Sequence, residues 1–142
     1  MQATLRAAAA RDVKAISALI DRYWRVAGVG LDGSLASLVS SRELKSLLRS
    51  AVGGGGLFVL CVEGVVRGVV AWRRNLQRPR SALVLALCVE PWAWESGGFE
   101  ALLEGGCEAM ARSGFERVEI RLGSEGSPAL LPLRSVGFVP SD

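Results

Sequence analysis

An apolar run from Leu83 to Val89 stands at the centre of the hydrophobic pattern, and its length and composition predict a buried strand. The run ends before Pro91 and the Gly97-Gly98 pair. Beyond the glycines, apolar residues recur at spacings of three and four, at Phe99, Leu102, Leu103, Cys107 and Met110. This spacing places them on one face of a helix. A strand, a glycine-containing turn and a helix can together bind an anion, because the first N–H groups of the helix lack intrahelical partners and the helix dipole is positive there.

The first third of the chain predicts a strand and two helices. Ala3–Arg6 has the pattern of a short strand. From Asp12 onward, apolar residues mark one face of a first helix, namely Val13, Ile16, Leu19, Ile20, Tyr23 and Trp24. The glycine-containing segment Val26–Gly33 is expected to be a connection. Ser40 and Glu43 have the spacing of a capping box, which predicts the start of a second helix.

A hairpin is predicted in the middle of the chain. Gly53–Gly56 is a run of four glycines and is expected to be a flexible connector. Leu57–Val62 and Val65–Trp72 flank Glu63-Gly64, where the glycine can supply the turn between two strands. The segment Arg73–Arg80 carries four arginines and is expected to be a polar loop.

After the central helix, which Gly114 should end, Phe115–Leu122 alternates as a strand does, and Pro128–Ser135 predicts a short helix. A strand stub is expected around Gly137-Phe138. The whole order is strand, two helices, three strands, helix, strand, helix and strand. It predicts a single α/β domain over residues 1–142, with a mixed, mostly antiparallel sheet flanked by about four helices on both faces.

Composition excludes several classes of protein. Half of the 142 residues are apolar and 6% are aromatic, which is not the composition of a disordered chain. No apolar run reaches the roughly 18–20 residues that span a bilayer. Arg11, Asp12 and Lys14 interrupt any signal-peptide core, so a cytoplasmic protein is expected. The net charge of +3 permits an anionic ligand but is too small to indicate nucleic acid. We therefore expect neither a nucleic-acid nor a membrane partner.

The residues available for chemistry are few. The chain has no histidine, which excludes Ser-His-Asp and Cys-His triads and the usual zinc sites. Cys61, Cys88 and Cys107 are widely spaced among apolar neighbours, so they are interpreted as reduced core residues rather than a disulfide framework. No bound metal is expected.

With this order of elements, the chain resembles the GNAT family of acyl-CoA-dependent N-acetyltransferases. Five segments resemble family signatures: Leu5–Ile16, Glu63–Val70, Leu87–Pro91, Gly114–Val118 and Val136–Pro140. The first half looks most like the branch that contains N-acetylglutamate synthase and related small-amine acetyltransferases. The resemblance implies the GNAT fold, acetyl-CoA as cosubstrate and a primary amine as acceptor.

The resemblance also implies which residues bind acetyl-CoA. They are Leu87, Cys88 and Val89 for the pantetheine, and Ser96, Gly97, Gly98 and Phe99 for the pyrophosphate. Trp94 stands where the family has arginine or glutamine, and Phe99 stands where it has a small residue. Either the Phe99 side chain crowds the pyrophosphate, or a one-residue insertion lets Gly98 take that role with Phe99 turned into the core. Glu95 would place an unfavourable carboxylate nearby.

The catalytic positions of the family also differ here. Leu83 stands where many relatives have a glutamate base, and Leu133 stands where they have a tyrosine acid. Glu90 is the best remaining candidate base, and the alternative is a solvated surface glutamate. Cys88 could accept an acyl group, but no neighbouring base is visible, which favours core packing.

Two arginines are candidate substrate ligands. Arg25, at the end of the first helix, could bind a carboxylate or could only compensate the helix dipole. Arg73, with the other arginines of its segment, could meet an acidic substrate or the 3′-phosphate of the cofactor, or could be solvated. Trp92 and Trp94 could stack on a ligand or form a protein interface.

These observations predict an N-acetyltransferase that moves an acetyl group from acetyl-CoA to a primary amine of a small molecule or amino acid. Positioning and backbone N–H groups would supply most of the catalysis. The alternative is a catalytically degenerate GNAT-fold domain that binds a ligand or dimerises. A homodimer is compatible with either hypothesis.

Overall fold

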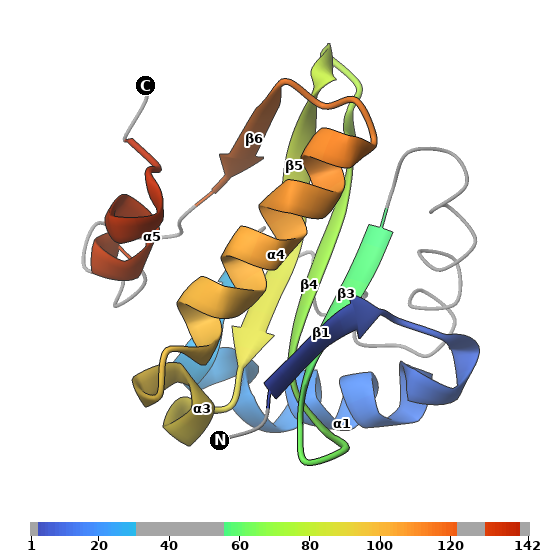
Figure 1. Cartoon of the computed structure of the whole chain (residues 1–142), viewed down its shortest axis with the longest axis vertical. Helices are drawn as coiled ribbons and strands as arrows, with labels where there is room; N and C mark the ends of the chain where they lie inside the picture. Colours follow the sequence, from blue (N-terminus) through green and yellow to red (C-terminus); the bar gives the residue numbers. More distant parts are fainter. Residues whose placement is uncertain (1–2, 31–55, 122–129, 140–142) are drawn as a thin grey trace.

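The computed structural model describes residues 3–30, 56–121 and 130–139, with side chains described for all of these except 24–30 and 130 (Figure 1). The elements in chain order are β1 (Ala3–Ala7), a 3-10 turn η1 (Ala10–Asp12), α1 (Val13–Ala27), β2 (Gly28–Gly30), β3 (Gly56–Val62), β4 (Val65–Asn75), β5 (Arg78–Val89), α3 (Pro91–Glu95), α4 (Gly98–Arg112), β6 (Arg117–Ile120) and α5 (Leu130–Val136). No helix in these described ranges is long and apolar enough to cross a membrane.

The six strands of the described residues form one mixed sheet in the order β1-β3-β4-β5-β2, and β6 also pairs with β5. Every strand pair is antiparallel except β5 and β6, which are parallel. Both β2 and β6 therefore use the same strand, β5, at different positions along its length. This arrangement confirms the predicted mixed, mostly antiparallel sheet.

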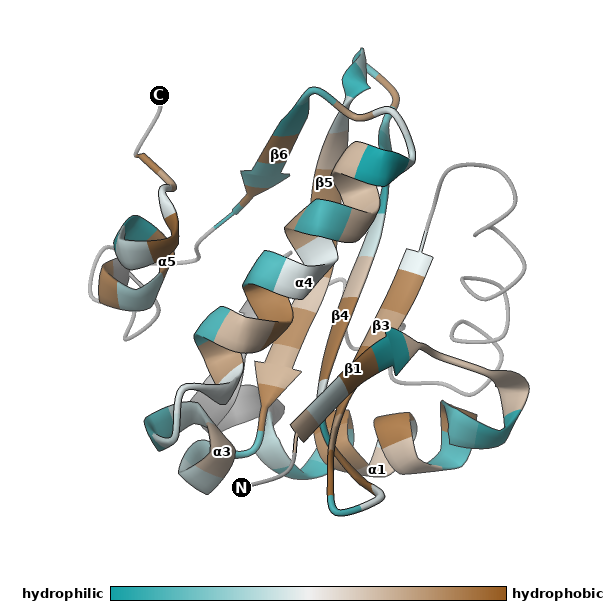
Figure 2. Ribbon diagram, viewed as in Figure 1, coloured by the Kyte–Doolittle hydropathy of each residue, from teal (hydrophilic) through white to brown (hydrophobic). Residues whose placement is uncertain are grey.

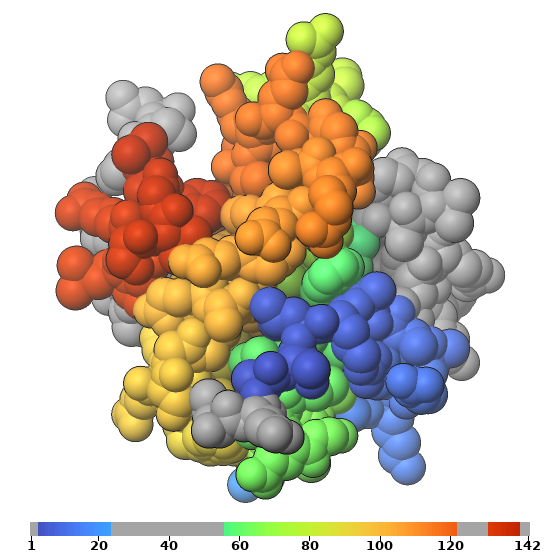
Figure 3. All heavy atoms as spheres, viewed as in Figure 1, coloured from blue at the N-terminus to red at the C-terminus, as the bar shows by residue number. Residues whose placement is uncertain are grey.

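The sheet is packed between helices, and each face has its own core. On one face, α1 packs Ile16, Leu19 and Ile20 against the sheet, whereas α4 packs Phe99, Leu102, Leu103 and Met110 against the other. Figure 2 shows the consequence: the central strands are apolar along most of their length, while α4 turns polar residues outward. In Figure 3 the atoms of α4 cross the molecule, with α5 against one side and β1 against the other.

The predicted hairpin between β3 and β4 is confirmed. Glu63 and Gly64 form its turn with φ angles of 52° and 81°, the left-handed geometry that suits two-residue hairpins. The connector predicted for Gly53–Gly56 is wrong at Gly56, which is the first residue of β3, and its other positions lie outside the described residues. A Cβ at Gly56 would lie 2.2 Å from the Trp72 ring, so glycine is needed there for strand packing.

The polar loop predicted for Arg73–Arg80 is also wrong. Strand β4 continues to Asn75 and β5 begins at Arg78, which leaves only Leu76 and Gln77 as the turn. The arginines can lie on strands because this end of the sheet extends into solvent, where side-chain partners hold them. Arg78 pairs with Glu119, and the Arg74 guanidinium lies 4.8 Å from the centre of the Phe115 ring.

One predicted connection is wrong as well, and one helix was not predicted. Helix α1 continues to Ala27 and β2 follows directly, so the connection predicted at Val26–Gly33 is wrong as far as Gly30. Pro91–Glu95 forms helix α3. Proline is tolerated at the first helical position, because the N–H that it lacks would have no acceptor within the helix. The second helix predicted from Ser40 lies outside the described residues.

The predictions near the carboxyl end are confirmed in part. The strand expected at Phe115–Leu122 is β6 over Arg117–Ile120, and the helix expected at Pro128–Ser135 is α5, described from Leu130. Residues 137–139, where a strand stub was expected, form a turn and irregular chain.

Candidate functional site

A β-bulge divides β5 into two halves that have different neighbours. Ala86 faces Ala71 of β4 and Val84 faces Trp72, so Leu85 is an extra residue without a partner on β4. Both Leu85 and Ala86 consequently face the α1 side of the sheet. A bulge of this kind bends a strand and increases its twist.

Strand β6 leaves β5 at this bulge. The parallel pairing covers Ser81–Val84 of β5 and ends at the pair Val84–Ile120, whereas β5 continues to Val89. Figure 1 shows β6 diverging from β5 in the direction of the β5 arrowhead. We call the Leu85–Val89 segment, along the side that β6 has left, the parted edge.

Main-chain groups of the parted edge can be assigned from the strand geometry. The N–H of Glu90 donates to the Arg67 carbonyl of β4 at 2.8 Å. Because alternate residues of a strand turn their N–H and C=O groups to opposite sides, Leu87 and Val89 turn theirs away from β4. Leu87 faces Val29 of β2, and Val89 lies beyond the last β2 pair, which joins Gly28 to Cys88.

The chain then passes through α3 to the first turn of α4. Gly97 precedes α4 with a φ of 88°, a left-handed conformation that favours glycine. The first N–H of α4 to find a main-chain acceptor is that of Ala101, which donates to the Gly97 carbonyl at 3.1 Å. The N–H groups of Gly98, Phe99 and Glu100 come before this bond, so helix geometry leaves them without intrahelical acceptors. This turn is the one for which the sequence predicted anion binding.

The Phe99 side chain and the two glycines before it have different surroundings. The Phe99 ring is fully buried and stacks on Trp94, with ring centroids 4.3 Å apart, so it is turned into the core. Gly98, however, serves the packing of α3, because a Cβ there would lie 2.6 Å from the Ala93 carbonyl oxygen. A Cβ on Gly97 would meet nothing within 4 Å. The open position in this turn is therefore Gly97.

The donor groups of Ser96, which were predicted to bind an anion, are engaged within α3. Its N–H and its hydroxyl both donate to the Trp92 carbonyl oxygen, at 3.2 and 3.0 Å, and so close the end of α3. The Gly97 N–H is likewise engaged by the Trp94 carbonyl at 3.0 Å. The main-chain donors thus begin two residues after Ser96, at Gly98.

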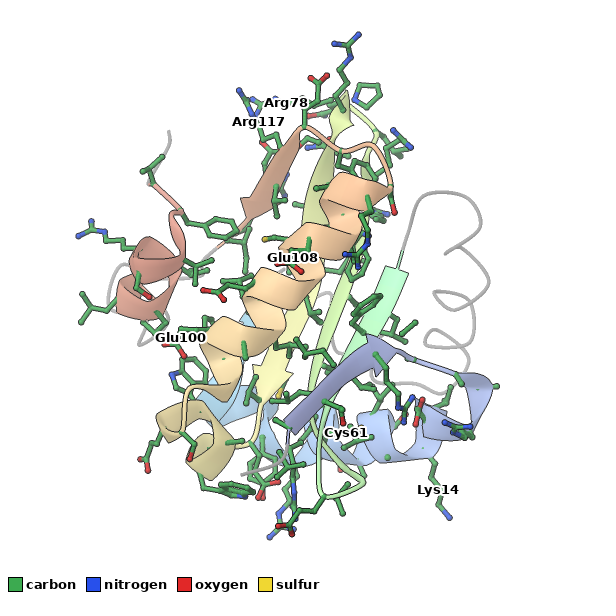
Figure 4. All side chains as sticks on the ribbon, in the orientation of Figure 1. Lys14, Cys61, Arg78, Glu100, Glu108 and Arg117 are labelled. Atoms are coloured by element: carbon green, nitrogen blue, oxygen red, sulfur yellow. The ribbon has the colours of Figure 1, made fainter. Side chains whose placement is uncertain are left out.

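Two carboxylates lie close to this turn in the sequence. Glu95 is exposed at the end of α3, and Glu100 lies in the first turn of α4. Figure 4 shows the Glu100 side chain leaving α4 on the side of α5, and its Oε2 is buried without a hydrogen-bond partner among the described residues.

Glu90, the candidate base, is buried rather than solvated, so the alternative of a surface glutamate is wrong. The residue is only 9% exposed. Its Oε2 accepts a hydrogen bond of 2.8 Å from Nη1 of Arg67, and the Arg67 guanidinium also lies 5.6 Å from the centre of the Trp92 ring. Arg67 reaches this position because it is the bulged residue between Val66 and Gly68, which face Cys61 and Leu60. This ion pair connects the residue that precedes α3 to β4.

Cys88 has the properties of a core residue. Its side chain is fully buried on the α1 face, and burial raises the pKa of its thiol to about 12. The thiol therefore stays protonated at neutral pH, which argues against a nucleophilic role. Leu83 and Leu133, at the positions of the family's base and acid, are also buried in the core.

Of the two candidate substrate arginines, the structure places Arg73 apart from the first turn of α4. Arg73 is exposed on β4 and faces Leu83 of β5, in the half of β5 that pairs with β6. Leu83 belongs to the core on the α1 face, and cross-strand partners share a face, so Arg73 lies on that face too. Arg25 lies near the carboxyl end of α1, where side chains are not described.

A polar cluster holds β5 and β6 together at the opposite end from the parted edge. Glu119 of β6 accepts hydrogen bonds from Asn75 at 2.7 Å and from Ser81 at 2.8 Å, and it also pairs with Arg78. These bonds lower the pKa of the Glu119 carboxyl. Figure 4 shows Arg78 and Arg117 at this tip of the sheet. The two strands are thus closed at one end and separate at the other.

The sequence did not identify three parts of this site, namely Arg67, the bulge at Leu85 and strand β2. An uninterrupted apolar run hides a bulge, because no change of face is visible in it. In the described part of the chain, no group of His, Cys, Asp and Glu side chains has the arrangement of a metal site.

Main-chain groups at two places in the site have the chemistry to bind parts of acetyl-CoA. The main-chain groups of Val89 and the N–H groups of Gly98, Phe99 and Glu100 suit an amide and a diphosphate, respectively. The open space at Gly97 allows a phosphate to approach the backbone closely. Trp94 supplies no cation, so in the described part of this turn the groups available to a diphosphate are main-chain N–H groups.

Comparisons with known proteins agree on the fold. Neither models of protein families nor curated protein sequences match the chain. Solved structures do match: an acetyltransferase of the GNAT family from Streptococcus pneumoniae has a TM-score of 0.80 at 19% identity, over 99% of this chain and 87% of the other. An acetyltransferase from Trypanosoma brucei has a TM-score of 0.71 at 20% identity, over 99% and 95%.

A third similar structure contains a ligand. The PaiA N-acetyltransferase from Thermoplasma acidophilum, solved in complex with coenzyme A, has a TM-score of 0.75 at 14% identity, over 100% of this chain and 92% of the other. These likenesses establish that the chain has the GNAT acyl-CoA N-acyltransferase fold.

Proposed function

We propose that this protein is an acetyl-CoA-dependent N-acetyltransferase that acetylates a primary amine of a small molecule. One observation carries the proposal: the bulge at Leu85 separates β6 from β5 just before the chain reaches the first turn of α4. An extended amide ligand along Leu87 and Val89 would end at free helical N–H groups. The structural similarity to acetyltransferases of this fold also supports the proposal.

The chain's main-chain groups would hold the cosubstrate. Leu87 and Val89 can pair with the amides of a pantetheine arm as a neighbouring strand would. The N–H groups of Gly98, Phe99 and Glu100 can donate to the diphosphate. Acetyl-CoA supplies a thioester carbonyl, and the amine nitrogen forms a bond to that carbon as the bond to sulfur breaks.

The described residues supply positioning rather than acid–base catalysis. Glu90 is bound to Arg67, and the Cys88 thiol is buried with a raised pKa. The amine must therefore bind in its neutral form, and its proton leaves to solvent or to the released thiolate. Alignment of the two reactants can supply several kcal/mol of the barrier, and a backbone N–H can polarise the carbonyl.

Arg73 suits an acceptor that carries a carboxylate. It lies on the α1 face beside Leu83, on the strand pair that leads to the parted edge. Its side chain is exposed, and none of the ion pairs between described residues involves it. A guanidinium in this place can hold a carboxylate while the amine reaches the thioester, so we propose amino acids or related amines as substrates.

The proposal is tested by binding first and by transfer second. Titration calorimetry should show heat with acetyl-CoA, and mass spectrometry should then detect acetylated products in a panel of amines. Arg73→Ala should raise KM about 10- to 100-fold for amines that carry a carboxylate and leave their decarboxylated analogues unchanged. Arg80→Ala is the matched control, because Arg80 lies on the same hairpin but pairs with Glu116.

Two results would contradict the proposal. The first is the absence of both heat and a thermal shift at millimolar acetyl-CoA. The second is binding of acetyl-CoA without transfer to any amine of the panel, which would leave a ligand-binding domain.

A further inference from the structure

Strand β2 occupies the parted edge. Gly28, Val29 and Gly30 pair antiparallel with Cys88, Leu87 and Ala86. By the alternation of β5, Leu87 directs its N–H and C=O toward this side, so Val29 is the residue that meets them. These are the same main-chain groups that the proposed function assigns to the cosubstrate.

We propose that β2 is a displaceable strand that covers the acyl-CoA edge in the free protein and unpairs when the ligand binds. The inference rests on the proposed function, because it concerns the same edge. A strand and an extended amide ligand offer Leu87 the same kind of hydrogen bonds, so both cannot occupy it at once.

The sequence of β2 makes its release inexpensive. It has three residues, and two of them are glycines, which add no side-chain contacts and regain much conformational freedom when they unpair. The exchange also conserves hydrogen bonds, because Leu87 loses one main-chain partner and gains another. Val89 lies beyond the last β2 pair, so a ligand can bind there and at the first turn of α4 before β2 leaves.

A reversible crosslink tests this competition. Gly28 directly faces Cys88, a free cysteine. Cys88 turns its main-chain groups to β4, so this is a pair without mutual hydrogen bonds, for which Cα atoms lie about 4.5 Å apart, within the range for a disulfide. Gly28→Cys should therefore form a disulfide with Cys88 when the reduced chain is refolded under mild oxidation, so that the Cys88 thiol can react before burial protects it, and mass spectrometry of the linked peptides identifies the bond.

Acetyl-CoA affinity is then measured by calorimetry in the oxidised and the reduced protein. The oxidised protein should bind acetyl-CoA at least about tenfold more weakly, because the disulfide prevents β2 from leaving β5. Reduction with dithiothreitol should restore binding. The control is Gly28→Cys combined with Cys88→Ser, in which oxidation should change nothing. Equal affinity in the oxidised and reduced forms, or failure of the disulfide to form in a folded protein, would overturn the inference.

A second variant acts in the opposite direction. Val29→Pro removes the N–H that faces Leu87 and should tighten acetyl-CoA binding several-fold, whereas Val29→Ala, which keeps the N–H, should gain less. Unchanged or weaker binding by Val29→Pro would overturn the inference while leaving the proposed function in place. If wild type, the reduced protein and Val29→Pro all fail to bind, the proposed function fails and the inference with it.

Discussion

Replacing Gly98 by alanine should destabilise the protein, because α3 packs directly against the place where the new methyl group would lie. The added Cβ would be 2.6 Å from the Ala93 carbonyl oxygen and 3.0 Å from Cδ2 of Leu60. The carbonyl belongs to the backbone of α3, so the contact can be relieved only by moving that helix. Overpacking of this kind costs about 1–3 kcal/mol. At about 3 °C per kcal/mol for a chain of this length, the melting temperature should fall by about 3–9 °C.

Replacing Gly105 by alanine, in the middle of α4, should instead stabilise the protein. At Gly105 a Cβ would meet Cδ1 of Leu5 at 2.5 Å, but Leu5 is 36% exposed and its side chain can rotate away. Alanine then gains up to about 1 kcal/mol of helix propensity over glycine. Urea unfolding followed by circular dichroism measures both variants against wild type. The reasoning is refuted if Gly98→Ala is as stable as wild type or more stable than Gly105→Ala.

Further predictions concern titration, reactivity and rate. Arg6 and the Ala9 N–H hold the Asp12 carboxyl and lower its pKa from 3.8 to about 2, so this stabilisation is present above pH 3.8 and is lost as pH falls through 2. Asp12→Asn should cost about 1–2 kcal/mol in urea unfolding at pH 7 and almost nothing at pH 2, and a difference independent of pH would contradict this. Cys88, with its thiol pKa raised to about 12, should resist iodoacetamide at pH 8 until the protein unfolds, and rapid alkylation of the native protein would refute its burial. If the amine must bind neutral, kcat/KM should rise about tenfold per pH unit up to the pKa of the acceptor, whereas a plateau near neutral pH would indicate a base.

The sequence predicted the elements whose pattern is local and strong. The apolar run that ends at Val89 could be identified as a strand because it is buried on both faces, and the spacing from Phe99 to Met110 could be identified as a helix because one face is buried. The pairing of Arg67 with Glu90 could not be predicted, because it joins residues 23 positions apart through a bulge.

Other features were hidden by their own composition. Two of the three residues of β2 are glycines, so the segment carries no strand signal, and tertiary pairing with β5 alone decides its conformation. The arginine-rich end of β4 and β5 has the composition of a loop, although Glu119 and Phe115 hold its side chains on strands. The orientation of Phe99 depended on where α4 begins, and the sequence left that open.

The proposed function requires the parted edge and the first turn of α4 to form one ligand site. Amide resonances of the ¹⁵N-labelled protein, followed during titration with acetyl-CoA, test this directly. We expect the largest shifts at Leu87, Val89 and the three residues Gly98–Glu100. Shifts confined to the arginines around Arg78, with Val89 and Gly98–Glu100 unmoved at saturation, would contradict it.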